Sequence, residues 1–307
     1  MTAFLVSLAV LVGGYIVYGV FVEKVFRIDP ARPTPAVSMA DGVDFVPMPA
    51  WKVFLIQFLN IAGLDPIFGA IMGVMYGPAA FLWIVLGTIF AGAVHDYVAG
   101  MISLRRGGAS LPEIVGQELG TGIKQVMRVF SVVLLILVGG VFVVTTSGLL
   151  ASLTPESLDA TFWAIVIFLY YLLATMFPID KVIGNVYPLF AAVLIFMAAA
   201  LVAVMLFGTV EVPDPFAGGM GNRYAGELAD THPLFPMLFI SIACGAISGF
   251  HATQSPMMAR CMKNERLARP IFYGAMVAEG IVALIWAAAT ITFTEGYDGL
   301  AAYMAQP

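Results

Sequence analysis

The chain has 307 residues, of which 61% are hydrophobic and only 11% charged, and its formal net charge is −5. Soluble domains are about half apolar and about a quarter charged. The composition therefore excludes an ordinary soluble domain and predicts an all-α polytopic membrane protein, with no nucleic-acid partner. The two cysteines, Cys244 and Cys261, give neither a disulfide framework nor metal-ligand spacing. We expect no metal and no cofactor.

Eight segments are long and apolar enough to cross a bilayer, which takes about 20 residues. In chain order they cover residues 3–22, 53–76, 78–104, 126–153, 158–177, 187–208, 234–257 and 270–293. No basic stretch precedes the first segment, so we interpret it as a retained span and not as a signal peptide. Ahead of the fourth, Ser110 and Glu113 have the spacing of a capping box. This pair predicts a short interfacial helix over 111–119.

The basic residues indicate which loops are cytoplasmic, because Lys and Arg concentrate on that side. With eight alternating spans, the loops after the first, third, fifth and seventh spans share one side. Those loops, together with Arg128 at the adjoining start of the fourth span, hold every Lys and Arg of the chain's 14 except Arg223. We therefore predict that these loops are cytoplasmic and that the N-terminus is outside.

Two of the spans are interrupted by Gly and Pro. The second contains NIAGLDP at 60–66, and the seventh contains CGAISGFHATQSP at 244–256. Such residues break helical hydrogen bonding, and the freed backbone groups are tolerated only inside protein or along a cavity. Two broken spans in matching positions are typical of a secondary transporter. The alternative is a pair of proline kinks in an ordinary helical membrane protein.

The spacing of the breaks favours a leucine-transporter-like (APC-type) core, in which each of two inverted five-span repeats begins with a broken helix. On this interpretation, residues 1–307 form one transmembrane domain. It contains a peripheral helix at 3–22, a first five-helix repeat at 53–208, and the first two helices of a second repeat at 234–293. The remaining three helices are absent, so we expect the core to be incomplete at the C-terminus.

Polar residues at the breaks are candidate substrate ligands. At the first break these are Gln57, Asn60 and Asp65, of which Asn60 and Asp65 are the chosen ligands. Asp65 lies about 12 residues into its span, near the midplane at about 1.5 Å per residue. An intramembrane carboxylate is a functional hypothesis by default, although Asp65 could instead cap the following half-helix. The second break supplies Ser248, His251, Thr253, Gln254 and Ser255, and the first four are the chosen ligands, because a helix start there would favour an anion. Local capping is again the alternative.

Three further ionisable residues are candidates for proton coupling, together with Asp65. They are the neighbours His95 and Asp96 in the third span, and Glu279, which is the only charged residue in the eighth. Histidine titrates near neutrality, and burial raises the pKa of a carboxylic acid. The alternative is that all three are polar anchors between helices.

Two other classes of function are weaker. The Gly245-to-Gly249 stretch holds Ser248 near His251, but its spacing is not the G-x-S-x-G of a serine hydrolase. A passive channel would need a selectivity-filter loop, and nothing in the sequence resembles one. We therefore expect a transporter and not an enzyme.

Five segments resemble the carbon starvation protein A (CstA) family. They are DPIFGAIMG at 65–73, GPAAFLWIVLG at 77–87, GAVHD at 92–96, SGFHATQSP at 248–256 and RPIFYGAM at 269–276. The resemblance runs over nearly the whole chain. It implies a multi-pass transporter of the bacterial inner membrane, induced in carbon starvation, that imports pyruvate with protons or, in older assignments, short peptides.

Members of this family usually continue with several more spans beyond the point where this chain stops. Either a second polypeptide supplies the missing helices, or the chain is a fragment. The partners implied are thus the lipid bilayer, a small carboxylate or peptide substrate, protons and that second polypeptide. The sequence does not choose between pyruvate and peptides, or between proton and sodium coupling.

Overall fold

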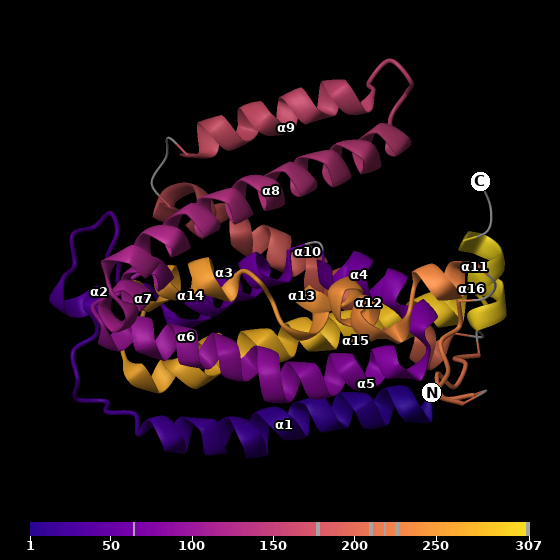
Figure 1. Cartoon of the computed structure of the whole chain (residues 1–307), viewed down its shortest axis with the longest axis horizontal. Helices are drawn as coiled ribbons and strands as arrows, with labels where there is room; N and C mark the ends of the chain where they lie inside the picture. Colours follow the sequence, from indigo (N-terminus) through magenta and orange to yellow (C-terminus); the bar gives the residue numbers. More distant parts are fainter. Residues whose placement is uncertain (64, 176–178, 209–210, 218, 225–226, 305–307) are drawn as a thin grey trace. The chain divides into compact units, whose positions relative to one another are not determined.

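A computed structural model describes residues 1–63, 65–175, 179–208, 211–217, 219–224 and 227–304, and every regular element in these ranges is helical (Figure 1). The chain forms two compact units. Unit 1 comprises Met1–Gly108 and Tyr187–Pro307, and unit 2 comprises Ala109–Val186. The two units are described separately below.

Unit 1 contains most of the helices. In chain order these are α1 (Thr2–Phe26), α2 (Pro35–Ser38), α3 (Ala50–Ala62), α4 (Asp65–Gly73), η1 (Val74–Tyr76), α5 (Pro78–Gly87), η2 (Thr88–Gly92), α6 (Ala93–Arg105), the later part of α10 (Ile179–Phe207), α11 (Glu227–Thr231), α12 (Leu234–Ser241), α13 (Ala243–Ala246), α14 (His251–Ala259), η3 (Glu265–Leu267), η4 (Arg269–Tyr273), α15 (Gly274–Phe293) and α16 (Tyr297–Met304).

Among the described residues, five continuous helical segments are long and apolar enough to cross a membrane, and α3 with α4 and η1 makes a sixth, bent span. These six coincide with predicted spans, so the all-helical polytopic class is confirmed. The predicted span at 158–177 appears as α9 (Ala160–Thr175), whose 16 residues cover about 24 Å of the roughly 30 Å hydrocarbon core. The predicted span at 234–257 is divided into short helices. The count of eight and the leucine-transporter-like core therefore stay predictions.

The first break is where the sequence predicts it. Helix α3 ends at Ala62, Gly63 has φ 53° and ψ −138°, and α4 begins at Asp65. A positive φ is readily adopted only by glycine, which explains why the helix stops there. Leu64 and the side chain of Asp65 lie outside the described part of the chain, so the expected capping role of Asp65 stays a prediction.

The second break has two interruptions. One is at Ile242, between α12 and α13, and the other runs from Ile247 to Phe250, before α14 begins at His251. The predicted interruption within 245–256 is confirmed. Pro256 lies inside α14 and does not cause it. The earlier interruption was not predicted, because isoleucine is not a helix breaker.

Small residues let the two broken spans approach each other closely. A Cβ atom on Gly69 would lie 2.5 Å from the backbone oxygen of Ser241, and one on Gly73 would lie 2.2 Å from Cγ1 of Ile242. A larger residue at either position would displace the segment around Ser241 and Ile242. The two glycines of α4 thus let the first broken span pack closely against the second at the Ile242 interruption, as expected for small residues between membrane helices.

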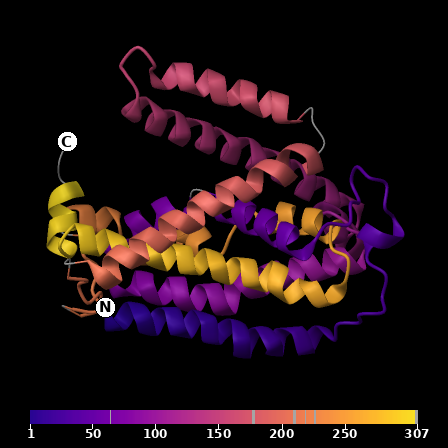
Figure 2. The ribbon, with the colours of Figure 1, turned by 180° about the vertical axis from the view of Figure 1, so that it is seen from behind.

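Helix α15 is the central element of unit 1. It packs against α1, α3, α4, α5 and α6, and most of its side chains are buried. A helix that is apolar all round is buried in this way. Seen from behind, the later part of α10 crosses α15 (Figure 2). Both continuous spans beside the breaks contain a π-helical turn, η2 and η4. The Tyr273 hydroxyl of η4 donates to the Ile89 carbonyl of η2 at 2.9 Å.

The two ends of unit 1 differ in charge. At one end Glu265, only 1% exposed, accepts hydrogen bonds from Arg32 at 3.1 Å, from Arg105 at 3.1 and 3.2 Å, and from the Asp29 amide at 2.8 Å. At the other end the Met1 ammonium donates to Val212. Arg223 lies at this second end, where its amide donates to the Met75 carbonyl. The N-terminus and Arg223 therefore share the end opposite to the main group of basic residues.

Unit 2 contains α7 (Leu111–Leu119), α8 (Thr121–Leu153), α9 and the start of α10, with α8 packed against both α7 and α9. The predicted capping box is present: the Ser110 side chain and the Glu113 side chain each pair with the other's backbone amide. The predicted interfacial helix at 111–119 therefore forms with the expected bounds.

Candidate functional site

The two breaks are joined by one serine. The Ser248 hydroxyl donates to the Ile61 carbonyl at 2.9 Å and accepts from the Phe250 amide at 3.2 Å, and Ser248 is 1% exposed. The Ile61 carbonyl belongs to the last turn of α3, whose carbonyls lack intrahelical donors. The second broken span thus satisfies a backbone group that the first break leaves open.

Asp96 is the centre of a buried polar cluster, which we call the Asp96 cluster: Gln57, Asp96, His251 and Ser255. The Gln57 amide nitrogen lies 2.9 Å from both carboxylate oxygens, and the Ser255 hydroxyl also bonds to Asp96. All four side chains have 0% exposure. They come from α3, α6 and α14, so both broken spans and the intact span 78–105 meet here. A buried carboxylate needs such donors to offset the loss of water.

Two histidines connect the Asp96 cluster to the surface of unit 1. His251 Nδ1 lies 2.9 Å from His95 Nδ1, and His251 Nε2 lies 3.9 Å from an Asp96 oxygen. His251 is fully buried, whereas His95 is exposed. His95, His251 and Asp96 thus form a row of neighbouring ionisable side chains, in which the two histidines are within hydrogen-bond distance of each other and His251 is close to the carboxylate.

The structure brings only part of the predicted site together. Asn60 accepts a hydrogen bond from the Tyr187 hydroxyl at 2.7 Å, and the Thr253 hydroxyl donates to the Phe250 carbonyl at 3.2 Å, which is local bonding in the first turn of α14. Gln254 is buried, with 7% exposure. Glu279 has 0% exposure and lies in α15.

Gln57 and Ser255 were predicted only as polar residues supplied by the two breaks, and their bonds to Asp96 were not predicted. One signal could have indicated that Ser255 joins this group, because it follows His251 by four residues and so shares its helix face. For Gln57, no local signal points to Asp96. Its role depends on packing between helices that lie 39 residues apart in the chain.

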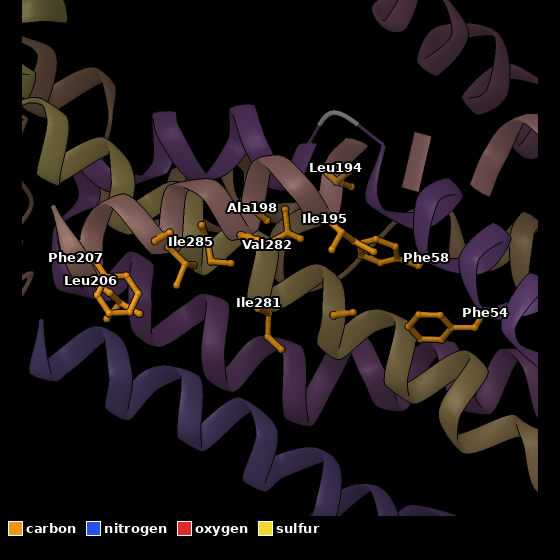
Figure 3. A pocket seen from close by; sticks show the side chains of 14 residues that line it. Phe54, Phe58, Leu194, Ile195, Ala198, Leu206, Phe207, Ile281, Val282 and Ile285 are labelled. Carbon is orange, nitrogen blue, oxygen red and sulfur yellow. The ribbon is translucent and has the colours of Figure 1, made fainter. Parts of the chain in front are cut away.

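An apolar cavity of about 490 Å³ lies elsewhere in unit 1, between α3, α10 and α15 (Figure 3). Its lining includes Phe54, Phe58, Leu194, Ile195, Val282 and Ile285. These side chains offer no polar group to a carboxylate. The Asp96 cluster and the adjoining breaks are therefore the better candidate site. Within the described ranges, no group of three or more His, Cys, Asp and Glu residues is placed to hold a metal ion.

Comparison with known proteins identifies the family. The family model described as carbon starvation protein CstA matches residues 1–158 and 154–305. An uncharacterized membrane protein of Haemophilus influenzae is 42% identical, over 98% of this chain and 93% of its own. The peptide transporter CstA of Campylobacter jejuni is 30% identical over 89% of this chain, and the pyruvate/proton symporter BtsT of Escherichia coli is 29% identical over 91%.

The chain spans about half the length of these two transporters, 47% in each case. No solved structure matches it. Because the CstA family model covers almost all of the sequence, the chain belongs to the CstA family of carbon starvation proteins.

Proposed function

We propose that this protein is the substrate-binding part of a secondary active transporter that imports a small carboxylate, pyruvate before short peptides, across the inner membrane with protons. The observation that carries the proposal is the meeting of two broken helices beside a buried carboxylate and two histidines. Non-helical backbone at membrane depth is tolerated where it lines a site. An intramembrane ionisable cluster at that place is a candidate ion pathway.

The substrate carboxylate would bind at the second break. Helix α14 begins there, at His251. The backbone N–H groups of a first helical turn are not used for hydrogen bonds within the helix, so they can donate to an anion. Ser248, Thr253 and Gln254 on this side, and Asn60 and Asp65 on the other, are the proposed lining residues. Ser248 donates its hydroxyl proton to a carbonyl, which supports a structural and binding role and not that of a nucleophile.

The proton would enter at His95, pass through His251 and reach Asp96. Protonation removes the charge that holds the Gln57 amide and Ser255 in place. The contact between α3, α6 and α14 would then loosen. Asp65 and Glu279 are the alternative coupling residues. The names of the two relatives, a peptide transporter and a pyruvate/proton symporter, support this class of activity for the family.

The test is uptake of labelled pyruvate and of a labelled dipeptide into membrane vesicles of the native host, with and without an imposed pH gradient. Asp96→Asn should abolish the response to the gradient while substrate exchange across the membrane persists. Asn has the size of Asp and can form hydrogen bonds, but it cannot carry the charge. Asp65→Asn and Glu279→Gln are the matched comparisons. An unchanged gradient response in Asp96→Asn would assign coupling elsewhere, and no uptake of either substrate by the wild type would refute the transporter.

The predicted orientation has its own test. Single cysteines placed at Arg223 and Lys263 should react differently with a membrane-impermeant reagent in intact cells. We expect labelling at position 223 only, because that end of unit 1 also holds the N-terminus. Labelling at 263 and not at 223 would reverse the topology.

A further inference from the structure

A second polar site lies within unit 2, in a pocket between α7 and α8. Its volume is about 380 Å³, and it is lined by Glu113, Gln117, Thr121, Lys124, Gln125 and Arg128. Every lining residue lies between 109 and 186, so the pocket belongs to one unit. The lining is mainly polar, unlike that of the apolar cavity of unit 1.

Two cations on one helix face give this pocket its charge. Lys124 and Arg128 are four residues apart on α8 and so point to the same side. Neither forms an ion pair with a carboxylate in the part of the chain that the structure describes. The one carboxylate in the lining, Glu113, is held by the Ser110 amide at 3.0 Å in the capping box. The pocket therefore has an excess of positive charge.

The position of Lys124 is fixed by packing. Its side chain crosses Gly116 of α7, where an added Cβ would lie 2.6 Å from Lys124 Cδ. A larger residue at 116 would displace this side chain. The stem of Lys124 thus packs across α7 beside the pocket that the residue lines.

Arg128 lies where α8 enters the hydrocarbon. The neighbouring Val126, Val129 and Phe130 are 64%, 65% and 57% exposed, as lipid-facing side chains are. Helix α7 has no fully buried residue, and Leu111, Ile114 and Leu119 share one apolar face. This is the pattern of a helix that lies in the membrane interface. A cation at this depth is costly unless it reaches water or an anion.

We propose that the α7–α8 pocket binds the phosphate group of an anionic phospholipid from the cytoplasmic leaflet. Lys124 and Arg128 pair with the phosphate, and Gln117, Thr121 and Gln125 are placed to hydrogen-bond the headgroup. The exposed apolar side chains of α8 lie along the acyl chains. The side of the membrane follows from the predicted topology, and anionic lipids are enriched there. This site is independent of the proposed transport activity.

The experiment is a titration of the full chain with phosphatidylglycerol and, separately, phosphatidylcholine, with bound lipid measured by native mass spectrometry. Wild type should prefer phosphatidylglycerol. Each basic residue near a membrane surface contributes about a fivefold change in binding, so Lys124→Gln with Arg128→Gln should weaken phosphatidylglycerol binding about thirtyfold. Glu113→Gln should strengthen it by up to about fivefold, since Gln also serves in a capping box.

The matched control is Lys24→Gln with Lys263→Gln, which removes the same charge from exposed residues of unit 1. It should leave lipid binding unchanged. Equal losses in the two double variants would show a general charge effect and overturn the site, as would equal binding of the two lipids by wild type. If the double variant fails to fold, Glu113→Gln decides alone. If the protein binds inorganic phosphate but does not bind phosphatidylglycerol, the pocket is a site for the free anion and the lipid proposal is refuted.

Discussion

Replacing Ser248 with alanine tests whether the two breaks depend on each other. The substitution removes the donor to the Ile61 carbonyl and the acceptor for the Phe250 amide, at a position that is 1% exposed. Hydrogen bonds between membrane helices contribute only about 0.6 kcal/mol on average. Here, however, the Ile61 carbonyl lies in the last turn of α3, where the helix itself supplies no donor, and it would stay buried without this hydroxyl. We expect a loss of about 1–3 kcal/mol.

The assay is reversible unfolding of the purified chain in bicelles, followed by circular dichroism. The control is Thr292→Val, which removes a hydroxyl of equal burial that donates to the Ala288 carbonyl at 2.7 Å. That carbonyl already accepts the regular backbone bond of α15, so the control should lose less than about 1 kcal/mol. Equal losses in the two variants would show that water or another group replaces Ser248, and would refute the dependence of one break on the other.

Three further predictions concern unit 1. Gly92→Ala should destabilise the fold by about 1–3 kcal/mol or more, because the new Cβ would lie 2.2 Å from the Ala246 carbonyl oxygen. The control is Gly139→Ala, where the new Cβ would have no atom within 4 Å; in the same unfolding assay it should be neutral or slightly stabilising. Glu265→Ala should lower the melting temperature more than Arg32→Ala does, because Glu265 is 1% exposed and has several donors, whereas the Arg32 side chain is 45% exposed; equal shifts would contradict this. Burial raises the pKa of the Cys261 thiol to about 11, so in a Cys244→Ser background a maleimide should label the folded protein slowly at neutral pH and quickly after unfolding; fast labelling of the folded form would contradict the burial.

Local signals predicted the parts of the fold that depend on a few adjacent residues. The capping box at Ser110 and Glu113 fixed the start of α7, and Gly63 fixed the end of α3, because each acts through its own backbone geometry. The interruption at Ile242 had no such signal. It lies where the α4 glycines bring another helix against it. The π-helical turns η2 and η4 were likewise not predicted.

The candidate site divides in the same way. His95, Asp96, His251 and Ser248 were predicted because polar side chains are rare in apolar spans, so composition alone singled them out. Gln57 and Ser255 were also named as polar residues of the breaks, but their pairing with Asp96 was not predicted, because they reach it through the packing of three helices. Asp65, expected at the centre of the site, has a side chain outside the described part of the chain, and its role stays a prediction.

The hydrogen bond from Ser248 to Ile61 also has a consequence for synthesis of the protein. Its two residues are 187 positions apart. At a translation rate of 5–20 residues per second, Ser248 is made about 10 to 40 s after Ile61. During that interval the end of α3 has an open carbonyl for which lipid offers no donor. The first broken span should therefore stay within the insertion machinery, or near water, until the second has been made, and its release into the bilayer should be a late event.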